Sequence, residues 1–202
     1  VGVGAPRSAR FQLTHARIAH GTGGATGLSS FDIVAEGQVD VDRGLVELRS
    51  SLASVGQLDQ LGYAGTAPSV AAATHLVYDL GARQAFVERD GAWVSTPFPQ
   101  DEPGGLPGPE LYDPTRVLGY LRGSAAGEAE AARATVDGVP ATRRRLLLRT
   151  DAILGEGWVA LAWTADASGT VLQLELTNGF DDLTLHFTAF DEPVSIERPP
   201  AG

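Results

Sequence analysis

Apolar and polar residues alternate along two long stretches of this sequence. Residues 31–41 carry an apolar side chain at every second position, interrupted only by Gly37, and residues 183–189 follow the same pattern. A period of two places successive side chains on opposite faces of a β-strand. Each stretch is therefore predicted to be an amphipathic strand with one buried face.

Turn-forming residues between apolar runs predict further strands. Asp-Gly and related sequences at residues 42–44, 90–91 and 166–169 favour the positive φ angles of hairpin turns. A turn is also expected at residues 138–140. After the last long strand, residues 194–196 are expected to form a short strand that stops at the Pro-Pro pair, because proline has no N–H for a ladder. The strands expected are residues 11–20, 31–41, 45–52, 75–80, 84–88, 93–98, 133–137, 142–150, 158–164, 170–177 and 183–190.

One helix is expected in the middle of the chain, over residues 114–122. Asp113 can cap the free N–H groups of a helix, and a proline directly after it fits the first helical position. Val117, Leu118 and Leu121 then form an apolar stripe at helical spacing. Strands and helices do not alternate along the chain. The pattern thus predicts an α+β fold, in which about nine to eleven antiparallel strands form a strongly curved sheet around one or a few helices.

Two segments are less regular. Residues 53–74 have some helical spacing that glycines interrupt, and residues 99–110 are rich in proline and glycine and are expected to form a loop. No repeat or long linker divides the sequence, so residues 1–202 are expected to form a single domain.

Composition excludes several kinds of function. The net charge of −10 argues against a nucleic-acid partner, which would require a basic surface. The fifteen basic residues are all arginine, and the chain has no lysine, cysteine or methionine, a composition typical of high-GC genomes. This composition excludes Schiff-base formation by lysine, thiol nucleophiles, disulfides and thiolate metal sites. The sequence starts without an initiator methionine, so we expect a processed or trimmed product.

The polar residues show no catalytic pattern. The four histidines, at positions 15, 20, 75 and 186, lack metal-binding spacing, and no G-x-S-x-G motif is present. We therefore expect no enzyme, no cofactor and no metal. Arg143, Arg145 and Arg149 share one face of a predicted strand, opposite Leu146 and Leu148. An anionic headgroup could bind there, but ion pairs with the many acidic residues are the interpretation that we favour.

Several motifs resemble one known family when they are taken in order. They are the aromatic hairpin at residues 86–93, the D-P-x-x-(I/L)-L helix opening at 113–118, the hairpin at 137–142 and the tryptophan-led hairpin at 158–176. Together with the closing strand they resemble the LppX/LprG-type lipoproteins of mycobacteria (LppX_LprAFG), over residues 75–200. Two helices of that family have no counterpart here, one before the first strand and one at residues 151–157.

The resemblance implies a LolA/LolB-like half-barrel outside the cytoplasm. It implies an actinobacterial envelope lipoprotein, held to the membrane by a lipidated cysteine upstream of this chain. Its function would be non-catalytic binding or transport of acylated lipids or glycolipids, as a monomer. The alternative is an envelope lipoprotein that acts as a sensor or a protein-interaction platform.

The candidate ligand-binding residues are apolar side chains expected on the concave face of the sheet and on the helix. If the helix fills this space completely, no ligand can enter, and the platform alternative holds. The candidates are Phe31, Ile33, Val39, Leu118, Leu121, Leu172, Leu174, Leu176, Leu185 and Phe187, with Leu183 on the same face.

Overall fold

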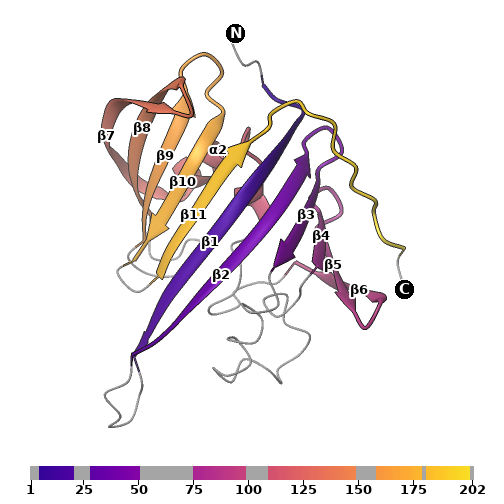
Figure 1. The fold of residues 1–202 in the computed structure, drawn as a ribbon. Coiled ribbons are helices and arrows are strands. Elements are labelled where there is room, and N and C mark those ends of the chain that lie inside the picture. The colour runs from indigo at the N-terminus through magenta and orange to yellow at the C-terminus, as the bar shows by residue number, and fades with distance from the viewer. Residues whose placement is uncertain are drawn as a thin grey trace.

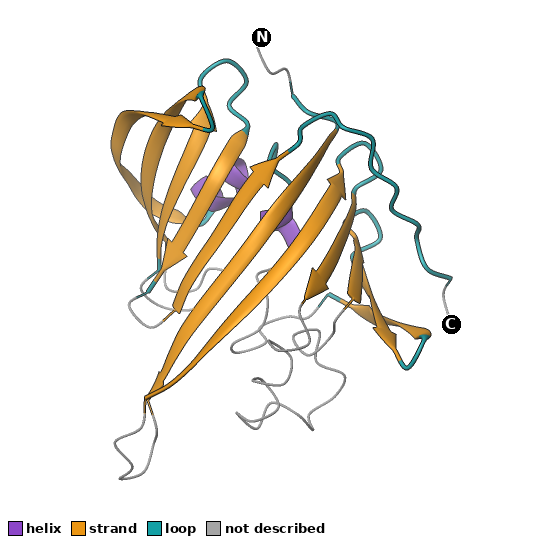
Figure 2. Cartoon of the chain, viewed as in Figure 1, coloured by secondary structure: helices purple, strands orange, loops and turns teal. Residues whose placement is uncertain are grey.

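A computed structural model describes residues 5–20, 28–50, 75–98, 109–148, 158–178 and 181–200. Within these residues, eleven strands form one antiparallel sheet with two short helical segments on its concave side (Figures 1 and 2). None of the helices described is long and apolar enough to cross a membrane. The strands are β1 (Ser8–His20), β2 (Leu28–Asp40), β3 (Leu45–Ser50), β4 (His75–Asp79), β5 (Gln84–Arg89), β6 (Ala92–Pro97), β7 (Ala125–Val136), β8 (Val139–Leu148), β9 (Val159–Ala165), β10 (Val171–Thr177) and β11 (Asp181–Thr188).

The first and last strands lie side by side in the middle of the sheet. The strand order is β6-β5-β4-β3-β2-β1-β11-β10-β9-β8-β7, so β1–β11 is the only neighbouring pair in this sheet that is not consecutive in the chain. Phe11 pairs with Phe187, and Leu13 pairs with Leu185. The predicted class, a strongly curved antiparallel sheet around a helix, is confirmed (Figure 1).

Two hairpins turn on pairs of residues with positive φ. Asp90 and Gly91 have φ angles of 48° and 76°, and Asp137 and Gly138 have 50° and 79°. Such pairs form two-residue turns whose twist matches that of the flanking strands. The predicted turn at residues 138–140 is therefore one residue too late. Its last two residues belong to β8 instead.

The helical region differs from its prediction in where it begins. The α-helix α2 (Val117–Gly123) starts three residues later than predicted. A 3₁₀-helix, η2 (Pro109–Tyr112), begins in the last two residues of the expected loop and extends past it. Asp113 accepts hydrogen bonds from the backbone N–H (2.9 Å) and the hydroxyl (2.6 Å) of Thr115. The Asp113 side chain therefore stabilises the turn before the helix and does not form the helix cap predicted from the sequence. The ambiguous segment 53–74 and residues 99–108 lie outside the described residues.

A β-bulge in β10 changes the face of the sheet on which the side chain of one predicted site residue lies. Val171 pairs with Thr164, but Gln173 already pairs with Trp163, so β10 has one extra residue at this point. Leu172 consequently packs in a separate cluster with Val136, Ala141 and Ala165. The prediction that Leu172 shares a face with Leu174 and Leu176 is wrong, because strict alternation does not continue across a bulge.

The chain after β11 forms a C-terminal strap, residues 192–200, instead of the predicted short strand. Ala189 and Asp191 have φ angles of 50° and 60°, which turn the backbone away from the ladder. The strap then crosses the outer face of the sheet beside β3 and β4 (Figure 1). Its Ile196 side chain is buried against Leu45, Val77 and Phe86, so this second apolar cluster lies outside the concave face.

Candidate functional site

The concave face of the sheet is a continuous apolar surface. Residues from both halves of the chain meet here because β1 joins β2 on one side and β11 on the other. Across β11, β10 and β9, Leu185 is in register with Leu174, and Leu174 with Ala162. The cluster consists of Ala9, Phe11, Leu13, Ala35, Val39, Val46, Leu48, Leu76, Tyr78, Ala85, Val87, Phe98, Leu111, Tyr112, Val117, Leu121, Leu146, Leu148, Trp158, Ala160, Ala162, Val171, Leu174, Leu176, Leu183, Leu185 and Phe187.

Most of the predicted site residues fall in this cluster or against it. Val39, Leu121, Leu174, Leu176, Leu185 and Phe187 belong to the cluster, and Leu118 is partly buried against it. Phe31 and Ile33 lie on β2, but their side chains are outside the described part of the structure. Leu172 lies in the separate cluster created by the bulge. The structure therefore brings together seven of the ten candidates.

An aromatic stack occupies the centre of the concave face. The Tyr112 ring, from η2, is stacked on Phe11 with ring centroids 5.1 Å apart and on Tyr78 at 6.1 Å. Gly37 makes room for the Phe11 ring, because a Cβ on this residue would overlap that ring and lie 2.6 Å from the carbonyl oxygen of Glu47. Gly37 thus shares the apolar face of β2, as the alternation predicts, and its lack of a side chain has a packing role.

The Tyr112 hydroxyl is a polar atom within this apolar interior. It is fully buried and has no hydrogen-bond partner among the described residues. Burial, with a smaller effect of Tyr78, raises the pKa of Tyr112 well above its usual value, so the hydroxyl stays protonated. A buried donor without an acceptor costs about 1–3 kcal/mol. The ester or carboxyl oxygen of a ligand could satisfy it.

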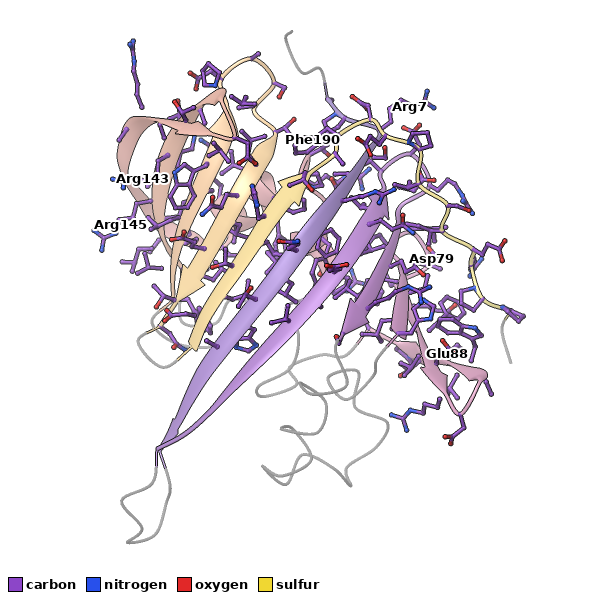
Figure 3. All side chains as sticks on the ribbon, in the orientation of Figure 1. Arg7, Asp79, Glu88, Arg143, Arg145 and Phe190 are labelled. Atoms are coloured by element: carbon purple, nitrogen blue, oxygen red, sulfur yellow. The ribbon has the colours of Figure 1, made fainter. Side chains whose placement is uncertain are left out.

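Charged residues border the concave face where α2 meets β7 and β8. Glu128 accepts a hydrogen bond from Nη1 of Arg144 at 2.7 Å, and Nε and Nη2 of Arg122 lie 3.2 Å from the same carboxylate. The Arg144 hydrogen bond, with the charge and hydrogen bond of Arg122, outweighs partial burial and lowers the pKa of Glu128. The arginine group predicted from the sequence does not lie here. Arg143 and Arg145 point away from the concave side (Figure 3), and Arg149 lies outside the described residues.

A polar groove of about 390 Å³ lies on the opposite, outer face. On its floor, the Nε2 atom of His75 is 2.7 Å from Glu47 and the Nδ1 atom is 2.6 Å from Glu88. A carboxylate only accepts hydrogen bonds, so both contacts are satisfied together only when both ring nitrogens carry protons. The groove is lined by Glu47, Arg49, His75, Val77, Trp93, Ser195, Glu197, Arg198, Pro199 and Pro200.

The Glu47 carboxylate in this groove has hydrogen bonds to three neighbouring side chains. Burial opposes its ionisation, but hydrogen bonds from Gln38, His75 and Arg49 together outweigh burial and lower the pKa of Glu47. The described residues contain no group of three or more histidine, cysteine or acidic side chains that could hold a metal ion. His15 is buried on β1, and His186 on β11 contacts Asp137 at 2.7 Å. Neither strand carries a residue that lines the groove.

Comparisons with known proteins give matches to solved structures only. No protein-family model matches the sequence, and no curated protein matches it. LprF from Mycobacterium bovis is 14% identical with a TM-score of 0.49, covering 98% of this chain and 90% of its own. LppX from Mycobacterium tuberculosis is 12% identical with a TM-score of 0.49, covering 95% and 90%. A LolA superfamily protein from Nitrosomonas europaea is 7% identical with a TM-score of 0.35, covering 95% and 89%.

Proposed function

We propose that this protein binds the acyl chains of a lipid against the concave face of its sheet, without catalysing a reaction on them. The observation that carries the proposal is the continuous apolar cluster that extends across the sheet from β5 to β8. Among the described elements, only the four residues of η2 and the seven of α2 cover it. A wide, concave apolar surface of this kind is suited to hold an apolar ligand.

The physical driving force would be burial of methylene groups. Each buried CH₂ contributes about 0.8 kcal/mol, and no polar contact along the chain is required. Affinity should therefore rise with chain length, and selectivity between similar chains should be weak. A position in the cell envelope and a lipid anchor upstream of this chain remain predictions from the family resemblance.

A second candidate function is an interaction platform with a closed interior. The observation that favours it is that Leu174 and Leu185 are 0% exposed, so the concave face is closed in this state. A lipid carrier must open to admit a ligand, whereas a platform needs no such change. A solution measurement of acyl-chain binding distinguishes the two functions.

The three tryptophans provide the test, because they lie on different faces. Trp158 belongs to the concave cluster, whereas Trp93 and Trp163 pack against the two outer clusters. Brominated fatty acids quench only a tryptophan that they touch. A variant that keeps Trp158 alone (Trp93→Phe with Trp163→Phe) should be quenched by the brominated acid. A variant that keeps Trp163 alone should not be quenched, and quenching in neither would refute the proposal.

A filling substitution gives an independent measurement. Leu174→Trp places a larger ring in the concave face, whereas Leu147→Trp places the same ring on an outward-facing position that is 52% exposed. We expect the first variant to weaken uptake of a fluorescent fatty acid and the second to bind as the wild type does. Circular dichroism and unfolding curves confirm that each variant folds. Acyl chains extracted from the wild-type protein would support the carrier, and clean extracts with no uptake would support the platform.

A further inference from the structure

Three arginines lie beside the apolar cluster, on the concave side of the sheet at its β7–β8 edge. We define Arg122, Arg133 and Arg144 as the arginine rim. Arg144 lies on the same face of β8 as the cluster residues Leu146 and Leu148, two and four residues along. Arg122 follows the cluster residue Leu121 at the end of α2. Arg122 and Arg144 therefore lie at the border of the apolar cluster.

The register of β7 places Arg133 on the same face. Arg133 pairs with Thr142, and Ala131 pairs with Arg144, so the two arginines are diagonal neighbours across the strands. Only the small Ala131 side chain stands opposite Arg144. Ala131 and Arg133 are both exposed, so this edge of the concave side is open to solvent.

The arginine rim has a positive charge that the acidic residue paired with it does not cancel. Glu128 binds both Arg122 and Arg144, while Arg133 makes no ion pair within the described part of the chain. Three positive charges and one negative charge leave an excess of about two in a protein whose net charge is −10. This local excess attracts an anion that the rest of the surface would repel.

Donors remain at the rim after Glu128 is satisfied. A guanidinium has five N–H groups. Arg144 uses Nη1 on Glu128, while its buried Nε has no hydrogen-bond partner among the described residues. A buried charged donor without an acceptor is unfavourable, so a second acceptor that reorients the guanidinium would relieve that cost. Guanidinium groups bind phosphate and carboxylate in a bidentate manner.

We infer that the arginine rim binds the phosphate or carboxylate headgroup of the lipid whose acyl chains occupy the concave face. This inference rests on the proposed function and specifies the ligand as an anionic acyl lipid. The apolar cluster holds the chains, and the rim fixes the end at which the lipid stays in contact with water. The arginines on the other face of β8, Arg143 and Arg145, take no part.

The test compares two fluorescent probes with the same acyl chain, a monoacyl phosphate and a neutral monoacylglycerol. The wild type should bind the anionic probe about tenfold more tightly. Arg133→Gln with Arg144→Gln should abolish this preference and leave binding of the neutral probe unchanged. Arg10→Gln with Arg145→Gln removes the same charge from exposed positions outside the rim and should retain the preference. Arg133→Gln alone, which breaks no ion pair to a described residue, should reduce the preference if the double variant does not fold.

Each possible failure points to a different conclusion. If neither probe binds the wild type, the proposed function fails. If both probes bind equally, or if the rim variant keeps its preference, the headgroup site is refuted while acyl binding stands. Titration with inorganic phosphate distinguishes the source of the anion. Arginine-dependent binding of phosphate as tight as that of the anionic probe would show a free-anion site and overturn the lipid assignment.

Discussion

Gly37 offers the sharpest test of how the concave face is built. In the structure it lies on β2 between β1 and β3, and the Phe11 ring of β1 covers it. Its φ angle is not in the positive region, so the backbone itself accepts alanine. The obstacle is space, since the added Cβ would overlap the Phe11 ring and lie 2.6 Å from the Glu47 carbonyl oxygen. Both neighbours must shift, and Phe11 is held between Tyr112 and Phe187.

The size of the effect follows from two opposing contributions. Forcing an extra methyl into a well-packed region costs about 1–3 kcal/mol. Alanine also restricts the unfolded chain, which stabilises the folded state by about 0.4–1 kcal/mol. Gly37→Ala should therefore lower the free energy of unfolding by about 1–2 kcal/mol, which lowers Tm by about 2–4 °C per kcal/mol at this chain length.

Urea unfolding, with a matched control, measures this effect. Gly119 lies in α2 with nothing within 4 Å of an added Cβ. Gly119→Ala should be neutral or stabilising by up to about 1 kcal/mol, because alanine favours a helix. Phe11→Leu removes the ring, so Gly37→Ala should cost less in that background. If Gly37→Ala is as stable as Gly119→Ala, the close approach of Phe11 is not present and the reasoning is refuted.

Two further predictions concern the outer face. The pKa of Glu47 is lowered from its ordinary 4.5, so its stabilising contribution is present above that pH and is lost as pH falls through the folded-state value. The difference in urea midpoint between wild type and Glu47→Gln should be largest near pH 7 and shrink below pH 4.5, and a constant difference would contradict the hydrogen-bond pattern. Ile196→Ala should cost about 2–4 kcal/mol and release the strap to proteolysis, because this side chain is only 2% exposed, whereas the exposed Glu197→Ala should change neither.

The sequence by itself determined the strands and most of the turns. Alternation predicts a strand wherever one face is buried. It holds over β2 and β11 because both lie in regular ladders with β1. Asp-Gly pairs predict two-residue turns because few other residues accept two consecutive positive φ angles. These signals are local, so they do not depend on what the rest of the chain does.

The predictions fail where the structure depends on contacts between segments that are distant in the sequence. The bulge at Leu172 depends on how β10 meets β9, and no residue type marks it in advance. Val194 and Ile196 have the alternation of a strand. The backbone instead turns away before them, and Ile196 inserts into an apolar patch formed by β3, β4 and β5.

Tertiary structure alone decided which charged residues lie beside the apolar face. In the sequence, the evident arginine group is Arg143, Arg145 and Arg149, because these residues alternate along one predicted strand. The rim instead combines one arginine from a helix with one from each of two strands, and Glu128 links two of them. Sheet curvature and strand register bring these residues together across more than twenty positions of the chain. The physical reason is that periodicity fixes the face on which a side chain lies, whereas register and curvature fix its neighbours.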